Sequence, residues 1–277
     1  MKNQLWIVGR NGMLARSVIA TCEKKGVPFF STSSCDLDIT SKDKVEAFAP
    51  PPFTHIVNCA AYTDVDGAER DEKAAYALNR DGPRYLAEKA ISCGAKLIHI
   101  STDYVFDGEL ERPYEESDAT SPLSVYGKSK RAGEEGVLTC SDEHLIVRTS
   151  WLFGTGKNFV ATMKRLMGER EALSVVCDQY GRPTFADDLA RALFEMAECR
   201  GLYHFANAGT TNWYEFAQAI KKRLCATRCT SIHPISTEGY PTPAKRPPRS
   251  ILSTAKVEKI LRRKPRHFEE CLDEYLK

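Results

Sequence analysis

The chain has 277 residues, of which 39 are basic and 37 acidic, so its formal net charge at pH 7 is +2. This near balance gives no electrostatic reason to expect a nucleic acid or an anionic membrane as a partner. The length is sufficient for one large domain, or for a large domain with a small companion, around a sizeable core.

No run of about 18 apolar residues occurs, and the apolar run near the N-terminus is too short for a secretory signal. We therefore expect a soluble, cytoplasmic protein without membrane contacts. Ten cysteines are scattered from Cys22 to Cys271, and only Cys225 and Cys229 are close in sequence, without a Cys-x-x-Cys pair. This pattern indicates reduced thiols rather than a disulfide framework or a zinc site.

The first element predicted is a strand from Gln4 to Val8, followed at once by GRNGMLA and an amphipathic helix through Lys25. A strand, a glycine turn and a helix in this order are typical of dinucleotide-binding folds. Gly9 would allow the tight turn, and Gly12 would let the backbone approach a pyrophosphate at the helix N-terminus. The expected cofactor contacts of this segment are Gly9, Arg10, Gly12, Met13 and Leu14. The same pattern also fits an ordinary strand-to-helix turn.

The second strand is predicted from Val27 to Phe30, and the polar residues Ser31 to Ser34 follow it. A site that prefers NAD usually carries a carboxylate at the tip of this strand. No carboxylate occurs among Ser31 to Ser34, and Arg10 in the glycine turn could contact a 2′-phosphate, so the sequence favours NADPH. NADH is the alternative, because Arg10 can equally be a solvated loop residue. Asp36 and Leu37 come slightly later, where the chain would pass under the adenine.

The third strand is predicted from His55 to Asn58, and it ends in the small residues Ala60 and Ala61. Small side chains would let a cofactor lie against the backbone, so Ala60, Ala61 and Tyr62 are expected cofactor contacts. A group of acidic residues follows, namely Asp64, Asp66 and Glu69. Acidic residues are common at a helix N-terminus, so we expect a helix start there and no metal site.

The fourth strand, from about Lys96, ends in the hydroxyl residues Ser101 and Thr102. Open α/β sheets bind ligands outside the carboxyl ends of their strands. Tyr126 and Lys130 are four residues apart, which on a helix places both side chains on one face. A hydride that arrives on a carbonyl carbon leaves negative charge on the oxygen, which must then be protonated. Tyr126 would supply that proton, and the cation of Lys130 would lower its pKa from about 10, although such a pair is also common on amphipathic helices.

The alternation of strands and helices predicts an α/β fold, namely a Rossmann-type doubly wound parallel sheet with a smaller C-terminal substrate-binding lobe. Residues 1–150 would form the NAD(P)-binding domain, with strands returning from about residues 174–206. Residues 151–277 would mainly form the lobe, interleaved with the first domain. A helix is expected from about Ala74 to Cys93, with Asn79 as a buried polar residue that supports the catalytic face.

Segments along nearly the whole chain resemble the extended short-chain dehydrogenase/reductases and, within that class, the dTDP-4-dehydrorhamnose reductase family. The segments that carry the resemblance are GRNGMLA, CDLDIT, NCAAYTDVDGAE, HISTDYVFDG, SPLSVYGKSKRAGE, IVRTSWLFG, DQYGRPT, GLYHFANAGTTNWYEFA and YPTPAKRPPRSILST. The segments of the second half are the most specific, because generic nucleotide-binding folds diverge there.

The resemblance implies a fold, a reaction and roles for the matching residues. NADPH or NADH would reduce the 4-keto group of a dTDP-linked 6-deoxy-4-ketosugar, giving dTDP-L-rhamnose. Tyr126 would donate the proton, Lys130 would hold the nicotinamide ribose and tune Tyr126, and Thr102 would hydrogen-bond the sugar carbonyl. Ser101, Tyr126 and Lys130 are expected cofactor contacts. The implied substrate contacts are Thr102, Asp103, Trp151, Asn158 and Arg246. Trp151 can alternatively be a core residue, and Arg246 would reach the diphosphate by charge-assisted hydrogen bonds.

Two further positions narrow the reaction and the metal content. Related dehydratases carry a Glu after the Thr-Asp pair, and the residue here is Tyr104, which favours simple reduction. Some relatives bind magnesium through an acid early in the first helix, where this chain has Ser17, so no metal is expected. A monomer and a homodimer both remain open.

Other functions remain open beside this interpretation. The regulatory subunit of methionine adenosyltransferase resembles these reductases and binds NADP without acting as a sugar reductase. Reduction of another nucleotide-linked ketosugar would use the same catalytic residues.

Overall fold

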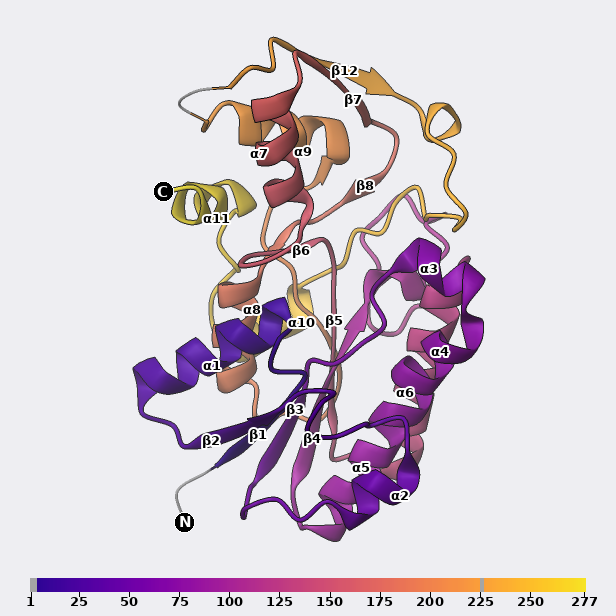
Figure 1. Cartoon of the computed structure of the whole chain (residues 1–277), viewed down its shortest axis with the longest axis vertical. Helices are drawn as coiled ribbons and strands as arrows, with labels where there is room; N and C mark the ends of the chain where they lie inside the picture. Colours follow the sequence, from indigo (N-terminus) through magenta and orange to yellow (C-terminus); the bar gives the residue numbers. More distant parts are fainter. Residues whose placement is uncertain (1–3, 225–226) are drawn as a thin grey trace.

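The computed structural model describes residues 4–224 and 227–277 of the chain (Figure 1). In this described part, the cysteines are free thiols, and Cys225 lies outside it. None of the helices described is both long enough and apolar enough to cross a membrane.

A six-stranded parallel sheet forms the centre of the larger half, with the strand order β10-β5-β4-β3-β1-β2. Its strands are β1 (Leu5–Val8), β2 (Phe29–Thr32), β3 (His55–Asn58), β4 (Lys96–Thr102), β5 (Leu145–Thr149) and β10 (Gly201–His204). Their short apolar runs suit a sheet that is covered on both faces. The expected doubly wound sheet is therefore confirmed, although β2 ends two residues later than the sequence indicates.

Helices cover both faces of this sheet (Figure 1). One face carries α1 (Met13–Lys25), α8 (Ala186–Glu195) and α10 (Ala255–Leu261), which share a core with Ile7 and Val147. The other side carries α2 (Lys42–Ala47), α3 (Val65–Arg70), α4 (Glu72–Tyr76), η1 (Ala77–Asp81), α5 (Gly82–Ser92) and α6 (Val125–Cys140). Trp6, Leu86 and Val137 pack together in the core on that side.

The expected helix over residues 74–93 is divided by a short π-helix, η1, between α4 and α5. A π-helical turn inserts a residue into the helical repeat and often lies at a functional site. Here it carries Asn79, which is fully buried.

A smaller lobe lies at one end of the sheet, at the top of Figure 1. It contains η2 (Asp103–Val105) at its border, and β6 (Leu152–Phe153), α7 (Phe159–Glu169), β7 (Ala172–Val176), β8 (Tyr180–Gly181), β9 (Thr184–Phe185), β11 (Thr211–Asn212), α9 (Trp213–Lys221), β12 (Ser231–Ile235), η3 (Thr237–Gly239) and α11 (Phe268–Tyr275). Phe153, Phe216 and Phe268 belong to its separate core.

The chain passes between the two halves more than once. Within residues 174–206, β10 and α8 join the larger half, as expected, but β7 pairs with β12 in the lobe. The segment therefore differs from the prediction that its strands return to the sheet: of the strands described there only β10 does so, whereas β7, β8 and β9 pair with β12, β11 and β6. The alternating buried and exposed residues of β7 suit a two-stranded sheet.

Candidate active site

A cavity of about 780 Å³ lies between the carboxyl ends of the sheet strands and the lobe. The chain runs from β1 outward to β2 and then back across to β3, so the strand order reverses between β1 and β3. This reversal opens a crevice at the strand ends, where doubly wound folds bind ligands. The cavity is lined from both halves by residues that include Gly12, Met13, Leu14, Ala60, Ala61, Ser101, Thr102, Asp103, Tyr126, Lys130, Trp151, Trp213 and Arg246.

The glycine turn after β1 leaves room for a phosphate group. Gly9 has φ +85°, and a Cβ there would lie 2.8 Å from the backbone nitrogen of Ala60, so only glycine fits. Gly12 is the N-cap of α1, without a side-chain hydrogen bond at the cap and without an acidic residue in the first turn. The amides at this helix start are thus open to an anion.

Ser101, at the end of β4, also fits a bound ligand. Its hydroxyl is buried and makes no hydrogen bond within the described protein. Buried polar groups are normally hydrogen-bonded, so this hydroxyl is suited to a partner outside the chain. Together with Ala60 and Ala61 on the cavity wall, it supports the fit of a dinucleotide along the strand ends.

A second cavity of about 250 Å³ continues from the glycine turn past the tip of β2. Leu37, Ala60 and Ala61 line it, which is where an adenosine would be expected. Asp36 instead accepts hydrogen bonds from the Ser33 amide (2.8 Å) and hydroxyl (2.7 Å), which lower its pKa. It also pairs with Arg10 at 3.2 Å. The tip of β2 therefore does carry a carboxylate, which the sequence reasoning did not place there.

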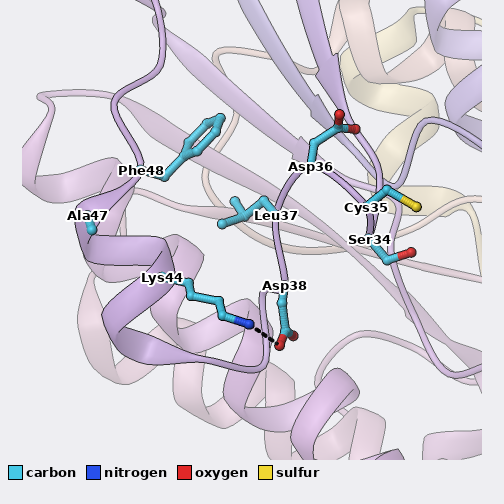
Figure 2. Close-up of a pocket in the computed structure, with 8 residues that line it drawn as sticks. All are labelled: Ser34, Cys35, Asp36, Leu37, Asp38, Lys44, Ala47 and Phe48. Atoms are coloured by element: carbon cyan, nitrogen blue, oxygen red, sulfur yellow. Dashed lines mark hydrogen bonds and ion pairs between the residues drawn. The ribbon is translucent and has the colours of Figure 1, made fainter.

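A shallow hollow of about 420 Å³ adjoins this second cavity (Figure 2). Asp38 and Lys44 lie on its wall and form an ion pair of 3.3 Å. The hollow shares Ser34, Leu37 and Asp38 with the adenosine end of the cofactor groove, and the catalytic residues line the large cavity instead. We therefore treat it as the outer margin of the groove.

Thr102, Tyr126 and Lys130 line the same cavity, as the sequence indicates. Lys130 is 2% exposed, and its amine donates to the carbonyl oxygen of Ile100 at 2.5 Å. Burial lowers the pKa of Lys130 to about 8. Burial also raises the pKa of Tyr126 well above its usual value. The expected lowering of this pKa by Lys130 is therefore absent in the free chain, because burial dominates and the amine is bonded to β4.

Thr102 is held in place from behind by Asp103. The Thr102 hydroxyl donates to a carboxylate oxygen of Asp103 at 3.0 Å, and the other oxygen accepts from Ser250. Asp103 is only 2% exposed, and burial raises its pKa to about 7. Asp103 thus lies on the cavity wall, but both of its oxygens already have protein partners.

The helix that carries Tyr126 and Lys130 docks on η1. The Asn79 side chain accepts from the Tyr62 amide (2.8 Å) and donates to the Ser129 hydroxyl (3.0 Å). The predicted burial of Asn79 is confirmed, and its bond to Ser129 ties it to the helix that carries Tyr126 and Lys130. Tyr62, in contrast, is not among the cavity-lining residues, and its backbone is bound to Asn79.

Two stacked indoles form the wall of the cavity on the lobe side. Trp151 has a positive φ of 46° and stacks on Trp213, with ring centroids 3.5 Å apart and planes 6° apart. Trp213, which the sequence reasoning did not select, donates its Nε1 proton to Gln179 at 3.2 Å. Its sequence signal, an aromatic residue at a helix start, is indistinguishable from ordinary packing.

The two remaining substrate candidates differ in their placement. Arg246 lines the cavity, pairs with Asp66 at 2.9 Å and donates to the Tyr104 hydroxyl at 3.2 Å. Asn158 is the N-cap of α7, accepts from the Ala161 amide at 3.0 Å and donates to the Gly154 carbonyl at 2.6 Å. It does not line the cavity, and its side chain caps α7, whereas the sequence analysis placed it among the substrate contacts.

Metal ligands are not grouped in the described part of the chain, where no cluster of at least three His, Cys, Asp or Glu residues suits an ion. Ser17 donates to Asp187 at 2.5 Å, which joins α1 to α8.

A parallel doubly wound sheet, a glycine turn and a Thr-Tyr-Lys group at one cavity define an NAD(P)-dependent reductase of the extended short-chain dehydrogenase/reductase class. Comparison with known proteins then narrows the class. The model of the family described as "RmlD substrate binding domain" matches residues 2–277. The dTDP-4-dehydrorhamnose reductase of Aggregatibacter actinomycetemcomitans is 40% identical over 287 residues, covering 97% of each chain. The chain belongs to the dTDP-4-dehydrorhamnose reductase family.

Solved structures agree with this assignment. A dTDP-4-dehydrorhamnose reductase from Clostridium acetobutylicum is 39% identical, with a TM-score of 0.94 and coverage of 99% of this chain and 98% of that one. The enzyme from Bacillus anthracis, solved in complex with NADP, is 36% identical, with a TM-score of 0.94 and coverage of 99% of both chains.

Proposed function

We propose that the chain reduces the 4-keto group of dTDP-4-dehydro-L-rhamnose to give dTDP-L-rhamnose, with NADPH as the preferred reductant and NADH as an alternative. The observation that carries the proposal is the meeting of Thr102, Tyr126 and Lys130 with the glycine turn at one cavity. Family membership supplies the nature of the sugar.

The cofactor would lie along the strand ends. Gly9, Gly12 and the start of α1 would hold its pyrophosphate. The small side chains of Ala60 and Ala61 would let the cofactor lie against the protein backbone. Lys130 and Ser101 would hold the nicotinamide ribose. NADPH, when bound, supplies the hydride for the carbonyl carbon.

Tyr126 would give its phenolic proton to the oxygen that becomes negative during reduction. Burial keeps the phenol protonated in the free chain, which suits an acid in the reductive direction. Thr102 would hydrogen-bond the same oxygen by turning toward it the one hydroxyl proton that it donates to Asp103 in the free chain.

The sugar and its nucleotide would occupy the side of the cavity formed by the lobe. Trp151, which lines the cavity and is held by its stack on Trp213, would contact the deoxysugar ring, and Arg246 would bind the diphosphate. Binding energy from the dTDP part would position the carbonyl beside Tyr126.

The test is to incubate the purified chain with NADPH and enzymatically prepared dTDP-4-dehydro-L-rhamnose. NADPH oxidation is measured as the decrease in NADPH absorbance. Tyr126→Phe should lower kcat by about 10²–10⁴-fold. Tyr85→Phe, on α5 away from the cavity lining, is the matched control and should retain activity.

Other outcomes would redirect the proposal. If the chain binds NADPH but leaves this sugar untouched, other nucleotide-linked ketosugars become the substrates to examine. Recovery of a synthetase partner without any ketosugar turnover would instead indicate the regulatory-subunit function. A cytoplasmic location is part of the proposal, supported by the free cysteines of the described residues.

A further inference from the structure

Three buried polar side chains form a row at the active-site cavity, where Asn58 and Lys130 line the wall and His99 lies between them. The amine of Lys130 lies 3.4 Å from Nε2 of His99, and Nδ1 of His99 lies 3.2 Å from the side-chain nitrogen of Asn58. His99 is 0% exposed and Asn58 is 1% exposed. Each contact in the row must therefore be satisfied within the protein.

The orientation of the Asn58 amide follows from its other contact. Its oxygen accepts a hydrogen bond from the backbone N–H of Ala60 at 3.1 Å. The reverse orientation would point an NH₂ group at that N–H, so the amide nitrogen must face His99. Nδ1 of His99 is consequently the acceptor.

The tautomer of His99 follows in turn. Burial lowers the pKa of His99 well below its usual value, so the ring is neutral. A neutral imidazole that accepts at Nδ1 carries its proton on Nε2. The Nε2–H group therefore points at the amine of Lys130.

An ammonium has three donors and no lone pair, so it cannot accept this N–H, whereas an uncharged amine can. The amine also donates to the Ile100 carbonyl at 2.5 Å, which either form can do. We propose that His99 is a positioning residue for Lys130: its Nε2–H, fixed by Asn58, favours the uncharged amine until the cofactor draws Lys130 toward the nicotinamide ribose.

Several charged or titratable groups face Lys130 from the surrounding elements. They are Tyr126 and Glu134 on α6, His99 on β4 and Asp103 in η2, and Arg148 on β5 pairs with Glu134. Glu134 favours the charged form of Lys130, but Arg148 binds both of its carboxylate oxygens at 2.7 Å. Burial outweighs this effect and lowers the pKa of Lys130 to about 8.

The consequence is proton uptake when the cofactor binds. This step rests on the proposed function, in which Lys130 holds the nicotinamide ribose. The ribose hydroxyls can accept from an ammonium, and the cofactor phosphates favour positive charge, so the pKa of Lys130 should rise in the complex. Below about pH 8 the free amine is already charged, and no uptake is expected. Above that pH, uptake should approach one proton, and the Kd should rise about tenfold per pH unit.

The test is calorimetric titration of the full chain with NADH at about pH 9, in two buffers of different ionisation enthalpy. The difference between the buffers gives the number of protons taken up. NADH is the probe because it lacks the 2′-phosphate, whose charge would add its own contribution to binding. The wild type should take up close to one proton.

Two variants probe the row, and each should reduce the uptake at that pH. In His99→Gln, the side-chain oxygen can face the ammonium. In Asn58→Asp, the new oxygen accepts from Nδ1–H and moves the lone pair to Nε2. His144→Gln is the matched control: His144 is also buried and binds the Leu97 amide of β4, but does not line the cavity. It should keep the wild-type uptake.

The possible results separate the two proposals. Tight binding without proton uptake in the wild type, or equal uptake in all four proteins, overturns the inference. Absence of binding of both NADH and NADPH to the folded wild type overturns the proposed function instead. If His99→Gln does not fold, Asn58→Asp tests the same tautomer from the other side.

Discussion

Gly133→Ala should destabilise the chain and impair the active site, because α6 meets η1 at this glycine. A Cβ at Gly133 would overlap the carbonyl oxygen of Asn79, well inside the 3.0 Å that real Cβ contacts respect. Asn79 cannot move aside easily, since its side chain is bound to Tyr62 and Ser129. Overpacking of this kind costs about 1–3 kcal/mol, and the higher helix propensity of Ala returns about 1 kcal/mol. The net loss of unfolding free energy should be up to about 2 kcal/mol.

Gly136→Ala is the control on the same helix. A Cβ there would lie 3.4 Å from Cβ of Arg84, an ordinary contact, so this variant should gain about 0.4–1 kcal/mol. Urea unfolding measures both differences, and NADPH oxidation measures the displacement of Tyr126 and Lys130. A shift of about 1 Å at the reacting groups can cost on the order of 100-fold in rate. Equal stability and activity of the two variants would refute the proposed docking of α6 on η1.

Three further predictions concern separate contacts. Glu134→Gln leaves the charge of the buried Arg148 guanidinium uncompensated and should lower the free energy of unfolding in urea by about 3–5 kcal/mol. Glu135→Gln, on the surface of the same helix, is the control and should lower it by less than about 1 kcal/mol. Similar losses in the two variants would contradict a stabilising buried ion pair. Trp213→Leu removes the stacking partner of Trp151, an interaction worth about 0.5–1.5 kcal/mol. The KM for the ketosugar should therefore rise about 2–10-fold, and the affinity for NADPH should not change. An unchanged KM would show that the stack does not contribute to sugar binding. Burial raises the pKa of Asp103 from 3.8 to about 7, so the folded chain binds the carboxyl proton more tightly than the unfolded chain. The protonated carboxyl therefore stabilises the fold at low pH, and this contribution to the free energy of unfolding is lost as the pH rises from about 4 to about 7. Asp103→Asn should therefore flatten the pH dependence of the urea midpoint over that window, and an unaltered dependence argues against the burial effect.

The regular part of the fold was open to prediction from local pattern alone. The strand predicted over His55–Asn58 has Ile56 and Val57 at its centre and follows a proline-rich loop, and the observed β3 has the same bounds. The four-residue spacing of Tyr126 and Lys130 predicts a shared helix face, and both residues do line one cavity. These features depend on residues close in sequence.

Features that join distant segments were not open to prediction in this way. The stack of Trp151 on Trp213 joins residues 62 positions apart, and the pairing of β7 with β12 depends on the fold of the lobe. The ion pair of Arg10 with Asp36 brings a carboxylate back to the tip of β2 through a turn of the chain. Asn158 resembles a polar ligand in sequence, but the helix start at Phe159 uses its side chain as a cap.

The position of β10 at the sheet edge has a consequence for synthesis on the ribosome. This strand pairs with β5 and contacts α10, which packs on the same face as α1. The nucleotide-binding half therefore cannot be completed until residues 201–204 have been made, long after β5. During that interval β5 is a bare edge of five apolar and polar residues, the kind of edge that pairs with other chains. A nascent or truncated chain that ends near residue 150 is thus the form most exposed to aggregation, and the two halves are not exchangeable modules.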